Sequence, residues 1–323
     1  MRVRANLPGP ATVALILLAG ILMALPLFTS SRSTFTMVNM ITTSAVFALS
    51  YNLLVGYTGI LSLGHALFFG SSAYIVGIMM RHVGTSLWIL FMAVLISMVF
   101  AVLAGLFVGY LTLRLKTIYY AMVTLAVAEL LVILAEKSRS LTGGLDGLNY
   151  RVPEFFQNAV VVYYLVLIYA IVALFLVRRF LDSPTGKVLV SIRENEQRAS
   201  SLGFDVFRYK LISSVAAGLL ASLTGVVFAI DNRFVMTSAL AVDRTLEALF
   251  ITIIGGVGTL PGPFIGAAVY HLAADWLSSL AKVHAIFERW PILFGGLYIV
   301  ITLTMPGGIV SAYYRLRLRR PRG

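Results

Sequence analysis

The chain has 323 residues, of which 59% are hydrophobic and 12% are charged, and its mean hydropathy is +0.93. Soluble domains are about 45–50% apolar and about 25% charged, so this chain has too few polar residues to cover a soluble core, and a soluble or disordered protein is excluded. The 25 Lys and Arg exceed the 13 Asp and Glu, which is typical of the cytoplasmic loops of membrane proteins and does not call for nucleic acid as a partner.

Long apolar segments follow one another along the chain. Crossing ~30 Å of hydrocarbon takes ~20 mostly apolar residues, and the continuous runs exclude an outer-membrane barrel, whose strands alternate. About ten segments are predicted, including short or broken ones: 11–28, 35–55, 65–80, 87–113, 117–135, 159–177, 209–230, 246–256, 263–280 and 287–305. Of these, 246–256 is too short to cross alone. We therefore predict an all-α polytopic membrane protein with one transmembrane domain over residues 1–323.

The charge distribution predicts the orientation of the spans. The first segment is expected to be retained rather than cleaved as a signal peptide, because no small-x-small cleavage site follows it and Arg32 comes next. If the N-terminus is cytoplasmic, ten spans place Arg2, the polar segment 178–208 and the basic C-terminal tail on the inner side. The sequence therefore predicts an N-in, C-in topology.

The second predicted span is unusually polar for a membrane segment. It contains Asn39, Thr42, Thr43, Ser44, Ser50 and Asn52. These side chains spread around the helix rather than forming one stripe, so we expect some of them to line a cavity.

Two glycine-rich stretches interrupt the apolar pattern. The first glycine break runs from Gly56 to His65, and the second runs from Gly255 to Pro263. Irregular backbone at membrane depth is tolerated where it meets protein or a water-filled cavity, and paired breaks in two halves of a chain indicate a translocation path. Close helix packing by small residues is the alternative. Neither break ends in Gly-Lys-Ser/Thr, so a phosphate-binding loop is excluded.

Glu129 is the ionisable residue placed most deeply within a predicted span, ~9 Å from its outer end at 1.5 Å per residue. A carboxylate at that depth lines a cavity or pairs with another group by default, and a structural hydrogen bond to a neighbouring helix is the alternative. Glu247 and Asp275 lie nearer the expected interfaces, where solvated or ion-paired roles are predicted. The four histidines are scattered and suggest no metal site.

The polar segment 178–208 predicts a short amphipathic helix on the cytoplasmic side. Ser183 followed by Pro184 is typical of a helix start, and Gly203 of a helix end. Apolar residues recur at helical spacing between them: Leu189, Ile192, Ala199 and Leu202. Such a helix could lie in the lipid headgroups, but the mixed charges that include Glu194 and Glu196 favour docking to a protein.

The same segment resembles a known family. Ser-Pro-x-Gly-Lys at 183–187, Ile-Arg-Glu-Asn-Glu at 192–196 and Leu-Gly at 202–203 are similar to the cytoplasmic coupling segment of branched-chain amino-acid ABC importer permeases. Further matches follow in order along nearly the whole chain: residues 52–59, 62–65, 121–126 with Glu129, 141–147, 254–263 and 288–290. The Ile-Arg-Glu-Asn-Glu form and the Leu-Thr-Gly-Gly loop resemble M-type rather than H-type subunits.

The resemblance implies a permease subunit of the bacterial inner membrane. It implies as partners a second, homologous H-type permease, two cytoplasmic ATPases that bind ATP and Mg²⁺, and an extracytoplasmic substrate-binding protein, with no cofactor, metal or catalytic residue in this chain. Branched-chain amino acids are the expected substrates, although related permeases move urea, short amides or aromatic carboxylates. A proton-coupled secondary transporter that relies on Glu129 is the alternative from another class. No convergent set of catalytic groups suggests an enzyme.

Two sets of candidate residues result. Those expected at the contact with the ATPase are Ser183, Pro184, Gly186, Ile192, Arg193, Glu194, Asn195, Glu196 and Gly203. Those expected along the translocation path are Asn39, Ser44, Asn52, Gly56, Gly59, Gly64, His65, Thr124, Glu129, Gly255, Gly256 and Gly258.

Overall fold

The computed structural model describes residues 31–115 and 117–280, with short stretches within 20–29 and 295–312. The predicted segments 11–28 and 287–305 lie largely outside the described residues, as do Arg2 and the basic C-terminal tail. The main helices are α2 (Arg32–Asn52), α3 (Ala66–His82), α4 (Leu87–Thr112), α5 (Thr117–Lys137), α7 (Ala159–Asp182), α10 (Val206–Asn232), α11 (Val242–Gly255) and α12 (Gly262–Leu280).

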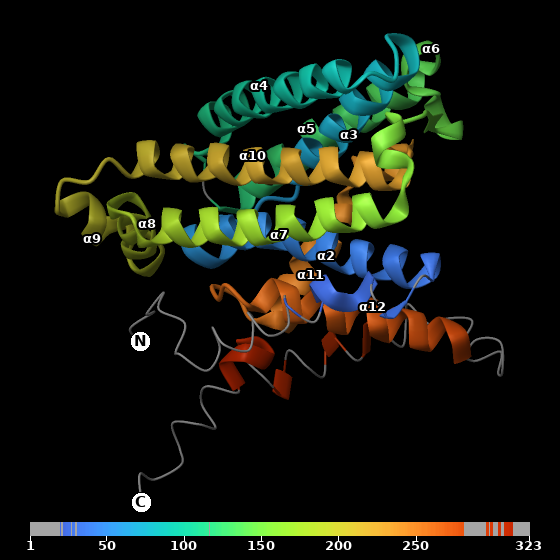
Figure 1. Ribbon diagram of the computed structural model, residues 1–323. Coiled ribbons are helices and arrows are strands. Elements are labelled where there is room, and N and C mark those ends of the chain that lie inside the picture. Colours follow the sequence, from blue (N-terminus) through green and yellow to red (C-terminus); the bar gives the residue numbers. More distant parts are fainter. Residues whose placement is uncertain are drawn as a thin grey trace, which may run out of the picture.

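Shorter elements join these helices. They are the π-helix η1 (Leu53–Thr58), helices α6 (Arg139–Thr142), α8 (Pro184–Glu194) and α9 (Glu196–Ser201), and the 3₁₀ turns η2 (Gly144–Asp146), η3 (Glu154–Gln157) and η4 (Thr237–Ala239). Strands β1 (Leu148–Asn149) and β2 (Phe234–Val235) pair antiparallel, with Leu148 opposite Val235. Helices α8 and α9 lie at one end of the bundle and α6 lies at the other (Figure 1).

Five helices in the described part of the chain are long and apolar enough to cross a membrane: Arg32–Thr58, Leu87–Thr112, Ile118–Lys137, Ala159–Asp182 and Val206–Asn232. Helices α3, with 17 residues, and α11, with 14, are shorter than the ~20 residues that a crossing needs. The prediction of a polytopic helical membrane protein is confirmed. The short α11 and the break after it agree with the prediction that 246–256 cannot cross alone.

Helix α2 lies at the centre of the bundle, and α7, α10, α11 and α12 all pack against it. Residues 42–52 of this helix are all buried, Val46 and Leu49 among them, whereas Met40 is exposed. The polar residues of this stretch, and Asn39 before it, are buried too, because they meet helices of the same chain rather than solvent. The polar residues of this helix therefore make contacts within the chain.

Small residues allow α3 and α10 to approach closely. A Cβ on Gly225 would lie 2.0 Å from the carbonyl oxygen of Phe69, and the hydroxyl oxygens of Ser72 and Ser222 are 2.6 Å apart. Such packing is typical of membrane helices, whose association depends on close van der Waals contact and hydrogen bonds. The close packing of α3 and α10 forms part of the helix bundle that positions the two glycine breaks.

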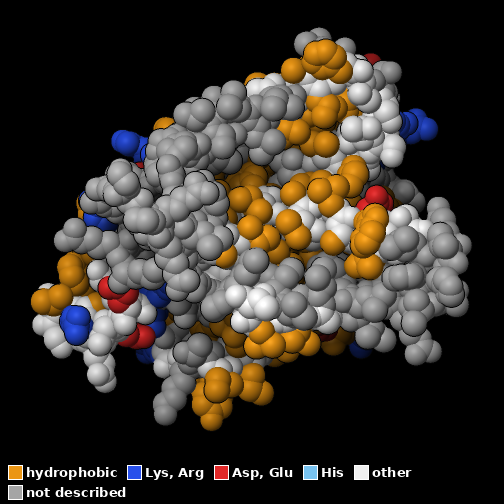
Figure 2. Space-filling view, turned by 90° about the horizontal axis from the view of Figure 1, so that it is seen from below, with side chains coloured by type: hydrophobic (Ala, Val, Ile, Leu, Met, Phe, Trp, Pro, Cys, Tyr) orange, Lys and Arg blue, Asp and Glu red, His pale blue; other side chains and the backbone are white. Residues whose placement is uncertain are grey.

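The outer surface of the bundle is apolar. Large side chains of α4 are exposed, including Phe91, Val99, Leu103 and Phe107. Figure 2 shows hydrophobic side chains across the middle of one face, while charged side chains lie towards the edges of the view. This distribution is the inverse of a soluble protein and fits a bilayer around the middle of the bundle.

Candidate functional site

The two glycine breaks, about 200 residues apart in the sequence, contact each other through Asn52. The side-chain amide of Asn52 donates to the carbonyl oxygen of Thr259 at 2.9 Å, and its Oδ1 accepts from the backbone N–H of Gly258 at 2.8 Å. A Cβ on Gly56 would lie 2.0 Å from Asn52 Oδ1 and 2.6 Å from the nitrogen of Gly258. Glycine at 56 is therefore required by the contact between the breaks.

The first glycine break begins with a change of helix type. Helix α2 continues into the π-helix η1 and ends at Gly59, whose φ of +77° is the left-handed conformation that glycine adopts without strain. A Cβ on Gly64 would lie 2.1 Å from the carbonyl oxygen of Thr124, so α5 packs directly on this break. Single π-helical turns occur frequently at functional sites.

His65 closes the first break without facing an open cavity. Its ring is fully buried, and Nε2 lies 2.8 Å from the hydroxyl oxygen of Ser50. The rings of Phe47, Tyr51 and Phe68 lie around it. These contacts place His65, which was predicted to lie along the translocation path, within an aromatic core.

The second glycine break separates α11 from α12. A Cβ on Gly255 would lie 1.9 Å from the carbonyl oxygen of Gly262, so the chain folds back on itself within this turn. Gly256 has a φ of +133°, and the Thr259 hydroxyl donates to its carbonyl at 2.8 Å. Gly255 is thus needed for close packing within the turn, and Gly256 for its backbone conformation.

The polar segment 178–208 contains two short helices, α8 and α9, rather than the single helix that was predicted. Ser183 Oγ accepts from the N–H of Gly186 at 3.3 Å, and Pro184 occupies the first helical position of α8, as expected. Asn195, however, is extended, with φ −160°, and its Oδ1 accepts from the N–H of Arg198 at 2.9 Å. Asn195 therefore ends α8 and caps α9, which is a role that its side chain favours. Gly203, with φ +88°, follows the end of α9.

The apolar residues of the segment do not all share one environment. Leu189, Ile192 and Ala199 are buried, whereas Leu202 is 69% exposed. Gly186 is buried, and a Cβ there would lie 2.5 Å from the carbonyl oxygen of Leu181. The close approach that Gly186 permits is therefore to the end of α7 in the same chain.

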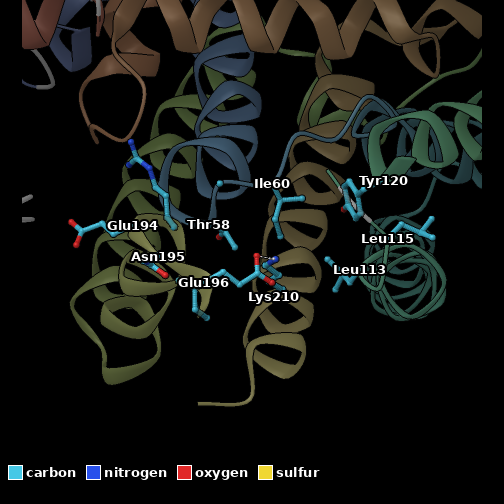
Figure 3. A pocket seen from close by; sticks show the side chains of 12 residues that line it. Thr58, Ile60, Leu113, Leu115, Tyr120, Glu194, Asn195, Glu196 and Lys210 are labelled. Atoms are coloured by element: carbon cyan, nitrogen blue, oxygen red, sulfur yellow. Dashed lines mark hydrogen bonds and ion pairs between the residues drawn. The ribbon is translucent and has the colours of Figure 1, made fainter. Parts of the chain in front are cut away.

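A polar cavity of about 190 Å³ opens beside α8 and α9. In Figure 3, Thr58 and Ile60 lie over its centre, Glu194 and Asn195 lie on one side, and Leu113, Leu115 and Tyr120 lie on the other. The Lys210 ammonium forms an ion pair with Glu196 at 2.7 Å across it. The cavity therefore lies between the polar segment 178–208 and the first glycine break.

Charged residues inside the bundle form a network around Glu247, for which the sequence predicted a solvated or ion-paired role. Arg244 Nη1 lies 2.6 Å from Glu247 Oε2, and its guanidinium is 4.8 Å from the ring centre of Phe69. Glu247 also accepts from Ser44 at 3.2 Å and lies 3.5 Å from His271. The spacing of Arg244 and Glu247 by three residues at the start of a helix was the available signal.

The remaining path candidates lie in different surroundings. Asn39 donates to Asp231 at 2.8 Å, which links α2 to the end of α10. Glu129 is half-buried on α5, and the described residues give it no ion-pair or hydrogen-bond partner. The structure thus joins Asn52, the two breaks and α8 in one place and leaves Asn39, Ser44 and Glu129 outside it.

The chain is similar to known transport proteins over most of its length. The family described as "Branched-chain amino acid transport system / permease component" matches residues 33–303. The high-affinity branched-chain amino acid transport permease LivM of Escherichia coli is 25% identical over 327 residues, covering 92% of this chain and 74% of the relative. LivH of Salmonella typhimurium is 23% identical, covering 83% and 91%. The autoinducer 2 import permease LsrC of Klebsiella pneumoniae is 28% identical, covering 66% and 62%. No solved structure matches.

Proposed function

Because the chain belongs to the branched-chain amino acid transport permease family of ABC transporters, we propose that it is the membrane permease of an importer for branched-chain amino acids. The family match over residues 33–303 is the observation that carries this proposal. As a permease subunit the chain is not itself an enzyme, and ATP is bound by separate ATPase subunits. The paired subunit is a homologous permease of the H type, and an extracytoplasmic binding protein delivers the substrate.

The substrate is proposed at the level of a class. Leucine, isoleucine and valine are supported by similarity to permeases named for branched-chain amino acids at 25% identity. The similarity to an autoinducer 2 import permease supports a different small molecule as the alternative substrate. Urea, short amides and aromatic carboxylates, which the family resemblance implies, are further alternatives. In transporters of this kind we expect the binding protein to set the selectivity.

Helices α8 and α9 are proposed as the contact with the ATPases. Both are short and capped, and they follow directly on α7 and lead into α10, two helices long enough to cross the membrane. Their outward side combines Leu202 with the exposed charges of Glu194 and Glu196. A mixed charged and apolar surface suits a protein partner, whereas a lipid-lying helix is typically basic on its polar face.

The glycine breaks are proposed to border the translocation path. Their backbone is irregular, and both lie between helices of a bundle whose outer surface is apolar. Breaks of this kind occur in transporters where the chain meets substrate or water. The contact through Asn52 means that the two breaks can change position together.

The orientation of the coupling helices can be tested with cysteine labelling, because the chain has no native cysteine. Ser200 is exposed on α9, and Ser140 is exposed on α6 at the other end of the bundle. In intact cells, an impermeant thiol reagent is expected to label a Ser140→Cys variant and to spare a Ser200→Cys variant. In inside-out vesicles, Ser200→Cys should be labelled, and bound ATPase subunits should protect it. External labelling of Ser200→Cys would contradict the proposed topology.

A further inference from the structure

The last turn of α8 places one arginine among three glycines. Nη1 of Arg193 donates to the carbonyl oxygen of Gly56. A Cβ on Gly59 would lie 3.3 Å from Arg193 Cγ, and a Cβ on Gly258 would lie 2.7 Å from Nη1. We call Gly56, Gly59 and Gly258 the glycine cradle. The aliphatic part of Arg193 packs on Gly59, and its guanidinium lies between the other two glycines.

The hydrogen bond from Arg193 to the carbonyl oxygen of Gly56 is favourable because Gly56 lies at the end of a long helix. Gly56 lies in η1, which completes the long helix Arg32–Thr58. The last carbonyl groups of a helix lack partners within it and carry partial negative charge, so a cation there is favourable. Arg193 supplies that cation from another element, and a bond from a charged donor is stronger than a neutral one.

The same side chain reaches the second glycine break. Gly258 contacts the guanidinium, and its N–H donates to Asn52, which stands one turn before Gly56. One residue of the coupling segment therefore contacts both breaks. Larger side chains at Gly59 or Gly258 would occupy the space that Arg193 fills, and one at Gly56 would collide with Asn52 and with the backbone of Gly258.

We infer that Arg193 is a positioning residue that transmits the movement of α8 to both glycine breaks. This inference rests on the proposed function, in which ATPases move α8 and the breaks border the path. Arg193 then acts through its own chain, by holding the end of the Arg32–Thr58 helix, rather than by contacting an ATPase. Glu194, next to it and exposed, remains available to the partner.

The alternative is that Arg193 contributes to ATPase binding, and a matched control separates the two roles. Arg198 is also an exposed arginine, on α9, and among the described residues its side chain makes no bond to the permease body. Arg193→Ala removes both the donor and the packing on Gly59. Arg193→Lys keeps the charge and one donor but loses the planar guanidinium that fits between two glycines.

The test uses the complete transporter, reconstituted in vesicles with its paired permease, ATPases and binding protein. Arg193→Ala is expected to retain ATPase co-purification and ATP hydrolysis while uptake per ATP falls about tenfold, the effect of losing one charge-assisted bond. Arg193→Lys should restore part of that loss, and Arg198→Ala, on the proposed ATPase contact itself, should keep the wild-type ratio of uptake to hydrolysis even where it weakens ATPase binding. A structural defect lowers ATP hydrolysis and uptake together. The ratio of uptake to hydrolysis therefore reports only how well the movement of α8 is transmitted to the glycine breaks.

Two results would overturn the inference. One is an unchanged ratio of uptake to hydrolysis in Arg193→Ala. The other is loss of ATPase co-purification in Arg193→Ala with normal binding in Arg198→Ala, which would assign Arg193 to docking. A wild-type complex that imports nothing on ATP hydrolysis would instead count against the proposed function.

Discussion

Valine at Gly59 or at Gly256 is expected to abolish uptake while leaving the transporter assembled. Gly59 and Gly256 have φ of +77° and +133°, where a β-branched residue is strained by about 1–3 kcal/mol. The new side chain at 59 would also press on Arg193, and the one at 256 would lie 3.1 Å at its Cβ from the carbonyl oxygen of Gly307. The measurement is substrate uptake into cells or vesicles, with membrane yield as the check on folding.

A matched control for these variants is Gly295→Val. Gly295 is helical, and a Cβ there would meet nothing within 4 Å. It should transport normally, because neither backbone strain nor contact is introduced. Normal uptake by both Gly59→Val and Gly256→Val would remove the support for a path beside the glycine breaks and for a packing role of these glycines.

Glu247→Ala is expected to lower the free energy of unfolding by about 3–5 kcal/mol, because it leaves Arg244 buried without its counter-charge. The two side chains are 15% and 17% exposed and lie 2.6 Å apart. Thermal unfolding of the purified, detergent-solubilised chain measures the effect. Glu154→Ala, a change at an exposed glutamate of η3, is the control and should have little effect.

The double variant Arg244→Met with Glu247→Leu separates charge from packing. Removing both partners of a buried ion pair and filling the space with apolar groups is often neutral or stabilising. The double variant should therefore be more stable than Glu247→Ala. Equal or lower stability would mean that the hydrogen bond from Ser44, the contact with His271 or the packing over Phe69 matters more than the pairing of the two charges.

Local features could be predicted from the sequence because their causes are local. The start of α8 follows from Ser183 and Pro184, whose side chains fix a helix terminus without help from distant residues. The glycine breaks follow from composition, since no regular helix tolerates so many glycines at that density. The sequence pattern predicted a single helix through Asn195. The break there could not be predicted, because the capping role of Asn195 depends on its extended backbone, which the pattern does not reveal.

Long-range contacts could not be predicted in the same way. Nothing in the local pattern pairs Asn52 with Gly258, or Arg193 with Gly56, because each pair is more than 130 residues apart and is brought together by the packing of α2, α8 and the second break. The local pattern does not place Arg244 among aromatic rings either. Its aromatic surroundings come from α2, α3 and α10, which the chain contributes separately.

ATP-dependent uptake by reconstituted vesicles tests the proposed function most directly. The vesicles contain this chain, its paired permease and the two ATPases, with the binding protein outside and ATP enclosed, and radiolabelled leucine is the substrate. We expect accumulation that requires both enclosed ATP and the binding protein, and that a proton gradient alone does not drive. Accumulation driven by a proton gradient without ATP would contradict an ABC permease and would favour a secondary transporter dependent on Glu129.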